Sequence, residues 1–206
     1  MKYNPQKHHR RSIRLKGYDY HNAGAYFVTI CTKNREFVLD DPIVKGITND
    51  VWLALPAWFP TIDLDEFVIM PNHTHFVIWL GVETFLADVQ DRGLPRPYQI
   101  PKPEKINTTP ALGDVVGAFK SLVFKVYFAW IKINDPSRRA KFWQRNYYEH
   151  IVRNEHELNA IRQYIIDNPK NWKMDRDNLE NLRNLSPPEN VDEYLKDVEE
   201  MLKIKL

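Results

Sequence analysis

The chain has 206 residues, of which 43% are hydrophobic and 13% are aromatic. This length suits one domain of ordinary size with appendages. The only cysteine is Cys31, which excludes an intrachain disulfide and a thiolate-based zinc site. No stretch resembles a signal peptide or approaches the length of a membrane span, so we expect a cytoplasmic protein without membrane contacts.

The net charge of +2 conceals an uneven distribution of charge along the chain. Residues 1–36 carry eight Lys or Arg against two Asp or Glu, and residues 102–145 carry nine against three. Residues 175–206 carry five Lys or Arg against nine acidic residues. Two basic blocks and an acidic tail favour a protein that binds a polyanion, although charged segments that are merely solvated would show the same pattern.

Hydrophobic periodicity divides the chain into strands and helices. Segments rich in β-branched and aromatic residues predict strands, and apolar residues at helical spacing predict helices. Asn154 with Glu157 has the pattern of a capping box, and Pro169 ends the helix that follows. In chain order, we expect a strand at 26–32, a helix at 43–59, strands at 64–70 and 73–80, a helix at 110–133, a strand within 142–151, a helix from 154 to about 168, and a helix at 188–205.

The order of these elements predicts an α+β fold. A βαββαβ order matches a ferredoxin-like antiparallel sheet with two helices on one face, here followed by C-terminal helices. We expect residues 1–24 to form a basic arm, residues 25–172 the main domain, and residues 173–206 a helical tail. The opposite face of the sheet is expected to be open, and residues 170–187 to be a polar connection.

His73 and His75 lie two residues apart in a predicted strand. Residues at this spacing point to the same face of a sheet, so both imidazoles could bind one divalent cation. Such a pair arises easily by chance, and two half-buried histidines bonded to their neighbours remain an alternative.

Tyr164 and Asn168 form a second pair, on one face of a predicted helix. The Asn168 carboxamide could be a further metal ligand, and the Tyr164 phenol could act as a nucleophile beside it. The alternative for this pair is a packed tyrosine and a C-terminal helix cap.

Longer strings around these pairs carry a family resemblance. MPNHTH at residues 70–75, FWQRNYYEHIVR at 142–153 and YIIDNP at 164–169 together resemble the REP-associated tyrosine transposases. This family belongs to the HUH class of single-strand nucleases. RSIRL at 11–15 and YFVTICT at 26–32 also look like that family, so the resemblance spans residues 8–172 in separated blocks.

The resemblance implies a fold, an activity and a site. The family has the ferredoxin-like sheet, and its members cleave and rejoin single-stranded DNA beside hairpins of repetitive extragenic palindromes. By this likeness, His73 and His75 are metal ligands, Asn168 occupies the third metal position, and Tyr164 is the catalytic tyrosine. The ligand set suits Mg²⁺ or Mn²⁺, although ligand type does not exclude zinc. The implied partner is single-stranded DNA with a REP-like hairpin. The implied location is the cytoplasm of a bacterium, near its nucleoid. The resemblance does not decide between a monomer and a homodimer.

Basic and aromatic residues outside this site are candidates for DNA contacts. Those that we select are Arg10, Arg11, Arg14, Lys120, Arg145 and Tyr147. The alternatives are a disordered arm for the three N-terminal arginines and a place in the core for the tyrosine. Two other functions also stay open, namely a nucleic-acid-binding module that does not cut and a metal-dependent RNA endonuclease that forms no protein adduct.

Overall fold

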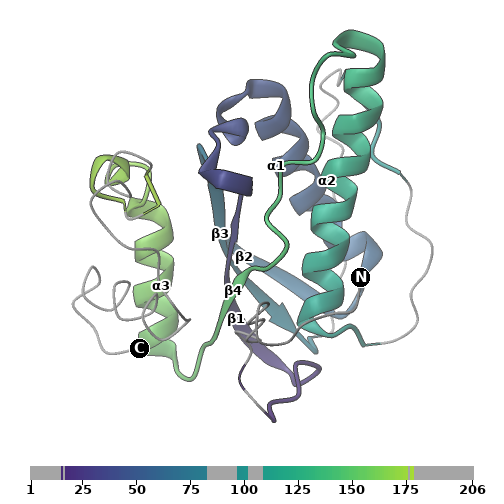
Figure 1. Ribbon diagram of the computed structural model, residues 1–206. Helices are drawn as coiled ribbons and strands as arrows, with labels where there is room; N and C mark the ends of the chain where they lie inside the picture. The colour runs from purple at the N-terminus through teal and green to yellow at the C-terminus, as the bar shows by residue number, and fades with distance from the viewer. Residues whose placement is uncertain (1–14, 16, 83–96, 102–108, 176, 179–206) are drawn as a thin grey trace, which may run out of the picture.

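The computed structural model describes residues 15, 17–82, 97–101, 109–175 and 177–178 (Figure 1). Its elements follow the predicted order. They are β1 (Gly24–Cys31), α1 (Pro42–Trp58), β2 (Ile62–Met70), β3 (His73–Leu80), α2 (Leu112–Asn134), β4 (Tyr148–Ile151) and α3 (Glu155–Asp167), with short 3₁₀ turns at Lys33–Arg35, Val38–Asp40 and Trp172–Met174. The α+β prediction is therefore confirmed. The predicted helix at 188–205 and most of the basic arm lie outside the described residues.

The four strands form one antiparallel sheet in the order β2-β3-β1-β4. This is the strand order of the ferredoxin-like arrangement, and the expected hairpin of β2 and β3 is present. The two central strands are almost wholly buried. In the register between them, Thr29 lies opposite His75 and Cys31 lies opposite His73.

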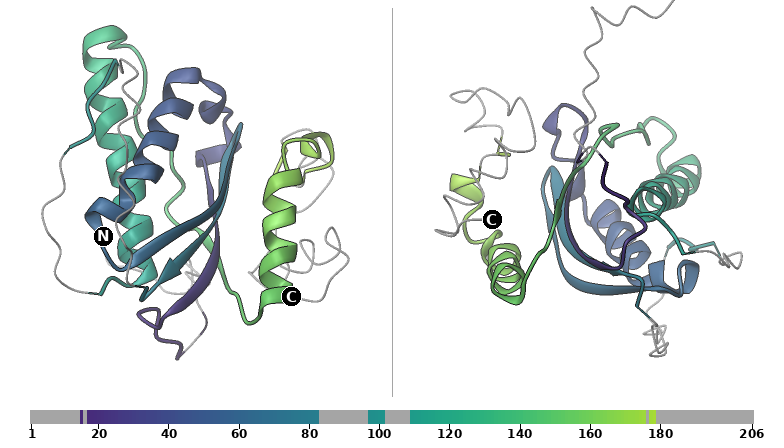
Figure 2. Two further views of the ribbon diagram at one scale, coloured as in Figure 1. Left: turned by 180° about the vertical axis from the view of Figure 1, so that it is seen from behind. Right: turned by 90° about the horizontal axis from the view of Figure 1, so that it is seen from below.

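Helices cover both faces of the sheet, which corrects the expectation of an open face. α1 and α2 lie together on one face, and α3 lies on the other (Figures 1 and 2). Alternation along the central strands supplies a core to each side. Facing α1 and α2 are Tyr26, Val28, Ile30, Phe76, Ile78 and Leu80, and packed with α3 are Ala25, Phe27 and Val77. The apolar residues of the second set explain why α3 docks, since an open face would expose them to water.

The start of α3 shows how local sequence places this helix. Asn154 caps it, because its side chain accepts a hydrogen bond from the Glu157 backbone N–H at 2.9 Å. The predicted capping box is only half formed. The Glu157 carboxylate accepts from the backbone N–H of Arg153 and bonds His150 Nε2 at 2.7 Å instead. The helix start is thereby tied to β4, which carries His150.

The described residues after α3 match the predicted polar connection only in part, since residues 170, 171, 173 and 174 are exposed and the three described residues after them are not. Asp175, Asp177 and Asn178 are all buried. The Asp177 carbonyl accepts from Asn72 Nδ2 at 2.6 Å, and the Asp177 carboxylate pairs with Arg35 at 2.7 Å. Polarity suggested a solvated linker, but these side chains find partners on the strand ends. No helix in the described part of the chain has both the length and the hydropathy needed to cross a membrane.

Candidate metal centre

His73 and His75 open β3 and point to the face that α3 covers. Both side chains are fully buried, and their ring centroids lie 4.4 Å apart. The intervening Thr74 alternates to the other face. The spacing in the sequence thus brings two imidazoles together inside the protein, where water does not compete for their nitrogens.

Each imidazole is oriented through its Nδ1 atom. His75 Nδ1 bonds Thr29 Oγ1 at 2.8 Å, and His73 Nδ1 bonds Asn72 Oδ1 at 2.8 Å. The Asn72 amide nitrogen donates to two backbone carbonyls, so its oxygen is the acceptor for the His73 N–H. A metal-binding histidine commonly donates one ring nitrogen to such a partner and keeps the lone pair of the other for the metal. The arrangement of His73 therefore leaves its Nε2 as the available ligand atom.

Tyr164 and Asn168 reach the histidines from α3. The Tyr164 hydroxyl lies 3.3 Å from His75 Nε2, and only 8% of the tyrosine is exposed. Asn168 ends the helix, where its backbone N–H donates to the Tyr164 carbonyl at 3.0 Å. Its Oδ1 is buried and has no hydrogen-bond partner in the described part of the chain. The structure thus brings the Tyr164 hydroxyl to the imidazole pair, while the roles of Tyr164 and Asn168 stay predictions.

Asp175 is a further residue of this centre that sequence reasoning missed. Its Oδ2 lies 3.7 Å from His73 Nε2. Ligand atoms of His73, His75 and Asp175 all lie within 4.8 Å of one another, and the three residues are buried. The sequence offered one signal for it, the Asp-x-Asp spacing of residues 175 and 177, but these two residues were interpreted only as part of the acidic tail.

Burial sets the protonation of the centre. It lowers the pKa of His73 and of His75 well below the usual value, with a smaller contribution from neighbouring positive charge. Both imidazoles are therefore neutral at pH 7 and can bind a metal. Burial, and next the charge of Asp177, raise the pKa of Asp175 to about 7. A cation between these groups would stabilise the carboxylate that burial disfavours.

The residues present fit a divalent metal ion. His73 Nε2 and Asn168 Oδ1 are buried polar atoms without hydrogen-bond partners among the described residues, and a buried polar atom left in that state is costly. Two imidazole nitrogens with carboxylate and carboxamide oxygens suit Mg²⁺ or Mn²⁺ once substrate oxygens complete the shell. The Cys31 thiol does not add to the set, because burial raises its pKa and keeps it protonated.

The predicted DNA-contact residues lie elsewhere. Arg10, Arg11 and Arg14 fall outside the described residues. Lys120, Arg145 and Tyr147 line one pocket beside α2. The Lys120 ammonium donates to the backbone carbonyls of Gln144 and Arg145, at 2.6 and 3.0 Å, so it braces the chain rather than standing free for a phosphate. Arg145 is exposed and Tyr147 is half-buried.

Comparison with known proteins gives a relative at the level of sequence and a more distant likeness in structure. No family model matches the chain. A solved structure of a REP-associated tyrosine transposase bound to a REP hairpin is 14% identical, over 79% of this chain and 76% of that one, with a TM-score of 0.49. That likeness is too distant to carry an argument about function. An uncharacterized protein of Haemophilus influenzae is 39% identical over 184 residues, which cover 85% of this chain and 96% of that protein. The chain therefore belongs to the same protein family as this Haemophilus influenzae protein.

Proposed function

We propose that this protein is a metal-dependent enzyme that cleaves and rejoins single-stranded DNA next to hairpin-forming repeats. The observation that carries the proposal is the Tyr164 hydroxyl at 3.3 Å from His75 Nε2, inside a buried cluster with His73 and Asp175. A nucleophile next to a candidate metal centre is the arrangement that phosphoryl transfer requires. The resemblance of residues 70–75, 142–153 and 164–169 to the tyrosine transposases supports the same chemistry.

His73, His75 and Asp175 would hold Mg²⁺ or Mn²⁺, with Asn168 as a further oxygen ligand. The bound ion would supply charge neutralisation and polarisation of the scissile phosphate. Thr29 and Asn72 hold the imidazoles in their orientation through Nδ1. These contacts fix the orientation of both rings, so little reorganisation of the imidazoles is needed when substrate arrives.

Tyr164 carries the covalent step. Its oxygen attacks phosphorus, the bond from phosphorus to the 3′-oxygen breaks, and a 5′-phosphotyrosine forms. The phenolic proton ends on the departing 3′-oxygen, so charge and atoms balance. Because the phosphodiester energy stays in the tyrosine ester, a later 3′-hydroxyl can reverse the step and rejoin DNA without ATP.

The test is a covalent-adduct assay with a labelled single-stranded hairpin and Mn²⁺. Tyr164→Phe should bind the hairpin as the wild type does and form no adduct. Tyr148→Phe is the matched control, because Tyr148 packs against the same apolar cluster from β4 and should still allow adduct formation. An adduct that persists in the Tyr164→Phe protein would refute the proposal.

Two further measurements separate the remaining functions. A protein that only binds nucleic acid would keep its affinity in a metal chelator and would never cleave a hairpin. An RNA endonuclease would cut the RNA version of the hairpin without adduct. The unpartnered His73 Nε2 and Asn168 Oδ1 favour a metal-dependent reaction over simple binding, because a binding sheet has no need of them.

A further inference from the structure

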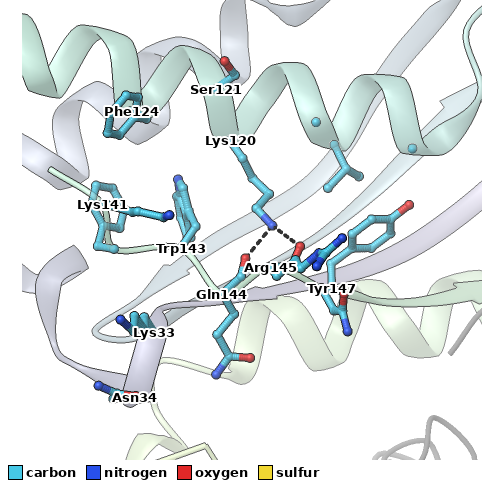
Figure 3. A pocket seen from close by; sticks show the side chains of 15 residues that line it. Lys33, Asn34, Lys120, Ser121, Phe124, Lys141, Trp143, Gln144, Arg145 and Tyr147 are labelled. Atoms are coloured by element: carbon cyan, nitrogen blue, oxygen red, sulfur yellow. Dashed lines mark hydrogen bonds between the residues drawn. The ribbon is translucent and has the colours of Figure 1, made fainter. Parts of the chain in front are cut away.

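A second site lies on the opposite side of the sheet from α3. It is a pocket of about 1120 Å³ between the N-terminal half of α2 and the segment that leads into β4 (Figure 3). This volume exceeds that of a typical cavity for one small ligand. The residues that line it include Lys33, Gly117, Phe124, Lys141, Trp143 and Arg145.

The pocket is cationic. Lys33, Lys141 and Arg145 are exposed, and none of them forms an ion pair within the described part of the chain. No acidic residue is among the described residues that line the pocket. The Lys120 ammonium donates hydrogen bonds to the backbone carbonyls of residues 144 and 145, which form part of the pocket wall (Figure 3). Three cations are thus left for an anionic ligand.

The pocket also offers flat apolar surfaces. Phe124 is 38% exposed, and its ring stacks on that of Phe128 with 5.6 Å between centroids. Trp143 is half-buried and packs against Phe142, with 4.8 Å between centroids. A methyl group added at Gly117 would meet nothing within 4 Å, so the helix surface is open at this point. Aromatic faces beside cations are the combination that binds unpaired bases with their phosphates.

The pocket and the metal centre share the end of β1. Thr32 bridges to Trp143, and the Gln144 N–H donates to the Cys31 carbonyl at 2.9 Å. Cys31 lies opposite His73 in the sheet. The next turn spans both sites, since Lys33 lines the pocket while Arg35 pairs with Asp177 beside the histidines. A chain bound in the pocket would therefore lie one short turn away from the centre.

We propose that this pocket holds unpaired nucleotides of the single-stranded DNA whose phosphate enters the metal centre. The inference rests on the proposed function for the identity of the strand. Lys33, Lys141 and Arg145 would contact successive phosphates, and Phe124 with Trp143 would contact bases. An acidic peptide would satisfy the cations and leave the aromatic surfaces without a matching partner.

The first experiment measures binding without catalysis. Fluorescence anisotropy of a labelled short oligothymidylate is followed over a range of salt concentrations, with EDTA present. Replacing Lys33, Lys141 and Arg145 together by Ala should lower the slope of log affinity against log salt by about 2, because each lost contact to a single strand removes about 0.7. The matched control replaces Lys45, Lys125 and Arg139, which are exposed and do not line the pocket. Equal losses in both triple variants would overturn the proposal.

The second experiment fills the pocket without changing charge. Gly117→Leu places an aliphatic side chain in the open space and should reduce oligothymidylate affinity about tenfold or more, while Gly117→Ala should keep most of it. Both residues favour a helix more than glycine does, so folding is not at risk. An unchanged affinity in the Leu variant, or equal binding of a duplex of the same sequence, would contradict the pocket. Since no metal is present, the pocket can pass this test even if Tyr164 never forms an adduct, and the two proposals can fail separately.

Discussion

Replacing Asp175 by Asn should stabilise the metal-free protein at alkaline pH. The carboxyl has an ordinary pKa of 3.8, and burial with the charge of Asp177 raises it to about 7 in the folded state. Above pH 7 the group is ionised in both states, and the folded state alone bears the cost of the buried charge. A pKa difference of this size is worth about 4 kcal/mol, at about 1.4 kcal/mol for each pH unit. Asn keeps the side-chain acceptor that the Asp177 N–H uses at 2.6 Å and removes the charge.

The pH dependence gives the sign of the effect. Between pH 3.8 and 7 the folded state holds a proton on Asp175 that the unfolded state has lost, so this group stabilises the fold as pH falls. His73 and His75 act in the opposite direction, because the unfolded chain binds two protons below about pH 6.5 and the buried imidazoles do not. Just below pH 6.5, where the unfolded chain gains protons on both histidines and the folded state does not, the three groups together lower the free energy of unfolding by about 1.4 kcal/mol per pH unit on acidification. Without Asp175 the two histidines alone give about 2.7 kcal/mol per pH unit.

Mn²⁺ should narrow the difference in stability between the two proteins. A metal held by the folded state adds about 2.7 kcal/mol of stability at a hundredfold excess over its dissociation constant. Asp175→Asn should lose most of that gain, because it removes one of the three clustered ligand residues. The variant is then more stable than the wild type in EDTA at pH 8 and gains less on metal addition.

Urea unfolding at several pH values, in EDTA and in Mn²⁺, tests this expectation. Asp177→Asn is the matched control, since Asp177 pairs with Arg35 and its loss should destabilise the protein. If Asp175→Asn lowers the stability of the metal-free protein at pH 8, the carboxylate is a favourable structural contact and its burial carries no net cost. An Mn²⁺ gain equal to that of the wild type would remove Asp175 from the ligand set.

Three further predictions concern stability, each measured by urea unfolding. Glu157→Ala should lower the free energy of unfolding by about 3 kcal/mol, because buried His150 and the backbone N–H of Arg153 both lose their partner. Glu157→Gln should lower it by less, because the amide oxygen can still accept a hydrogen bond. Similar losses in both variants would show that the charge alone matters. Gly117→Ala should stabilise the protein by about 1 kcal/mol, since the added methyl meets open space and glycine is a poor helix former, and a loss would mean a hidden clash. Arg162→Met should lower the free energy of unfolding by about 1 kcal/mol, because it breaks the two hydrogen bonds to Asp65 that join α3 to β2. The loss is small because solvent screens the half-exposed guanidinium. No change in stability would show that this pair does not tether the helix.

Much of the fold was accessible from local patterns. Segments rich in β-branched and aromatic residues predicted the central strands, and apolar residues at helical spacing predicted α1, α2 and α3 within a few residues. Proline and the cap at Asn154 marked the ends of α3. The common direction of His73 and His75 also follows from strand geometry alone, because side chains two residues apart share a face.

Other features depend on contacts between distant segments. The sequence could not reveal that α3 covers the second sheet face, because its apolar stripe fits any apolar surface of suitable shape. Docking of that helix brings the Tyr164 hydroxyl to His75, across 89 positions of the chain. The burial of Asp175 was hidden for a similar reason, since an acidic side chain signals exposure unless tertiary partners surround it.

By itself, then, the sequence determined the order of the elements and the pairing of two imidazoles, because both follow from the regular geometry of strands and helices. Only the tertiary structure decided which groups complete the centre. Packing alone sets the distance from Asp175 to His73, and packing alone makes the ionisation of that carboxyl costly. Local periodicity specifies which side of an element is buried, whereas the partners that it meets there depend on the whole chain.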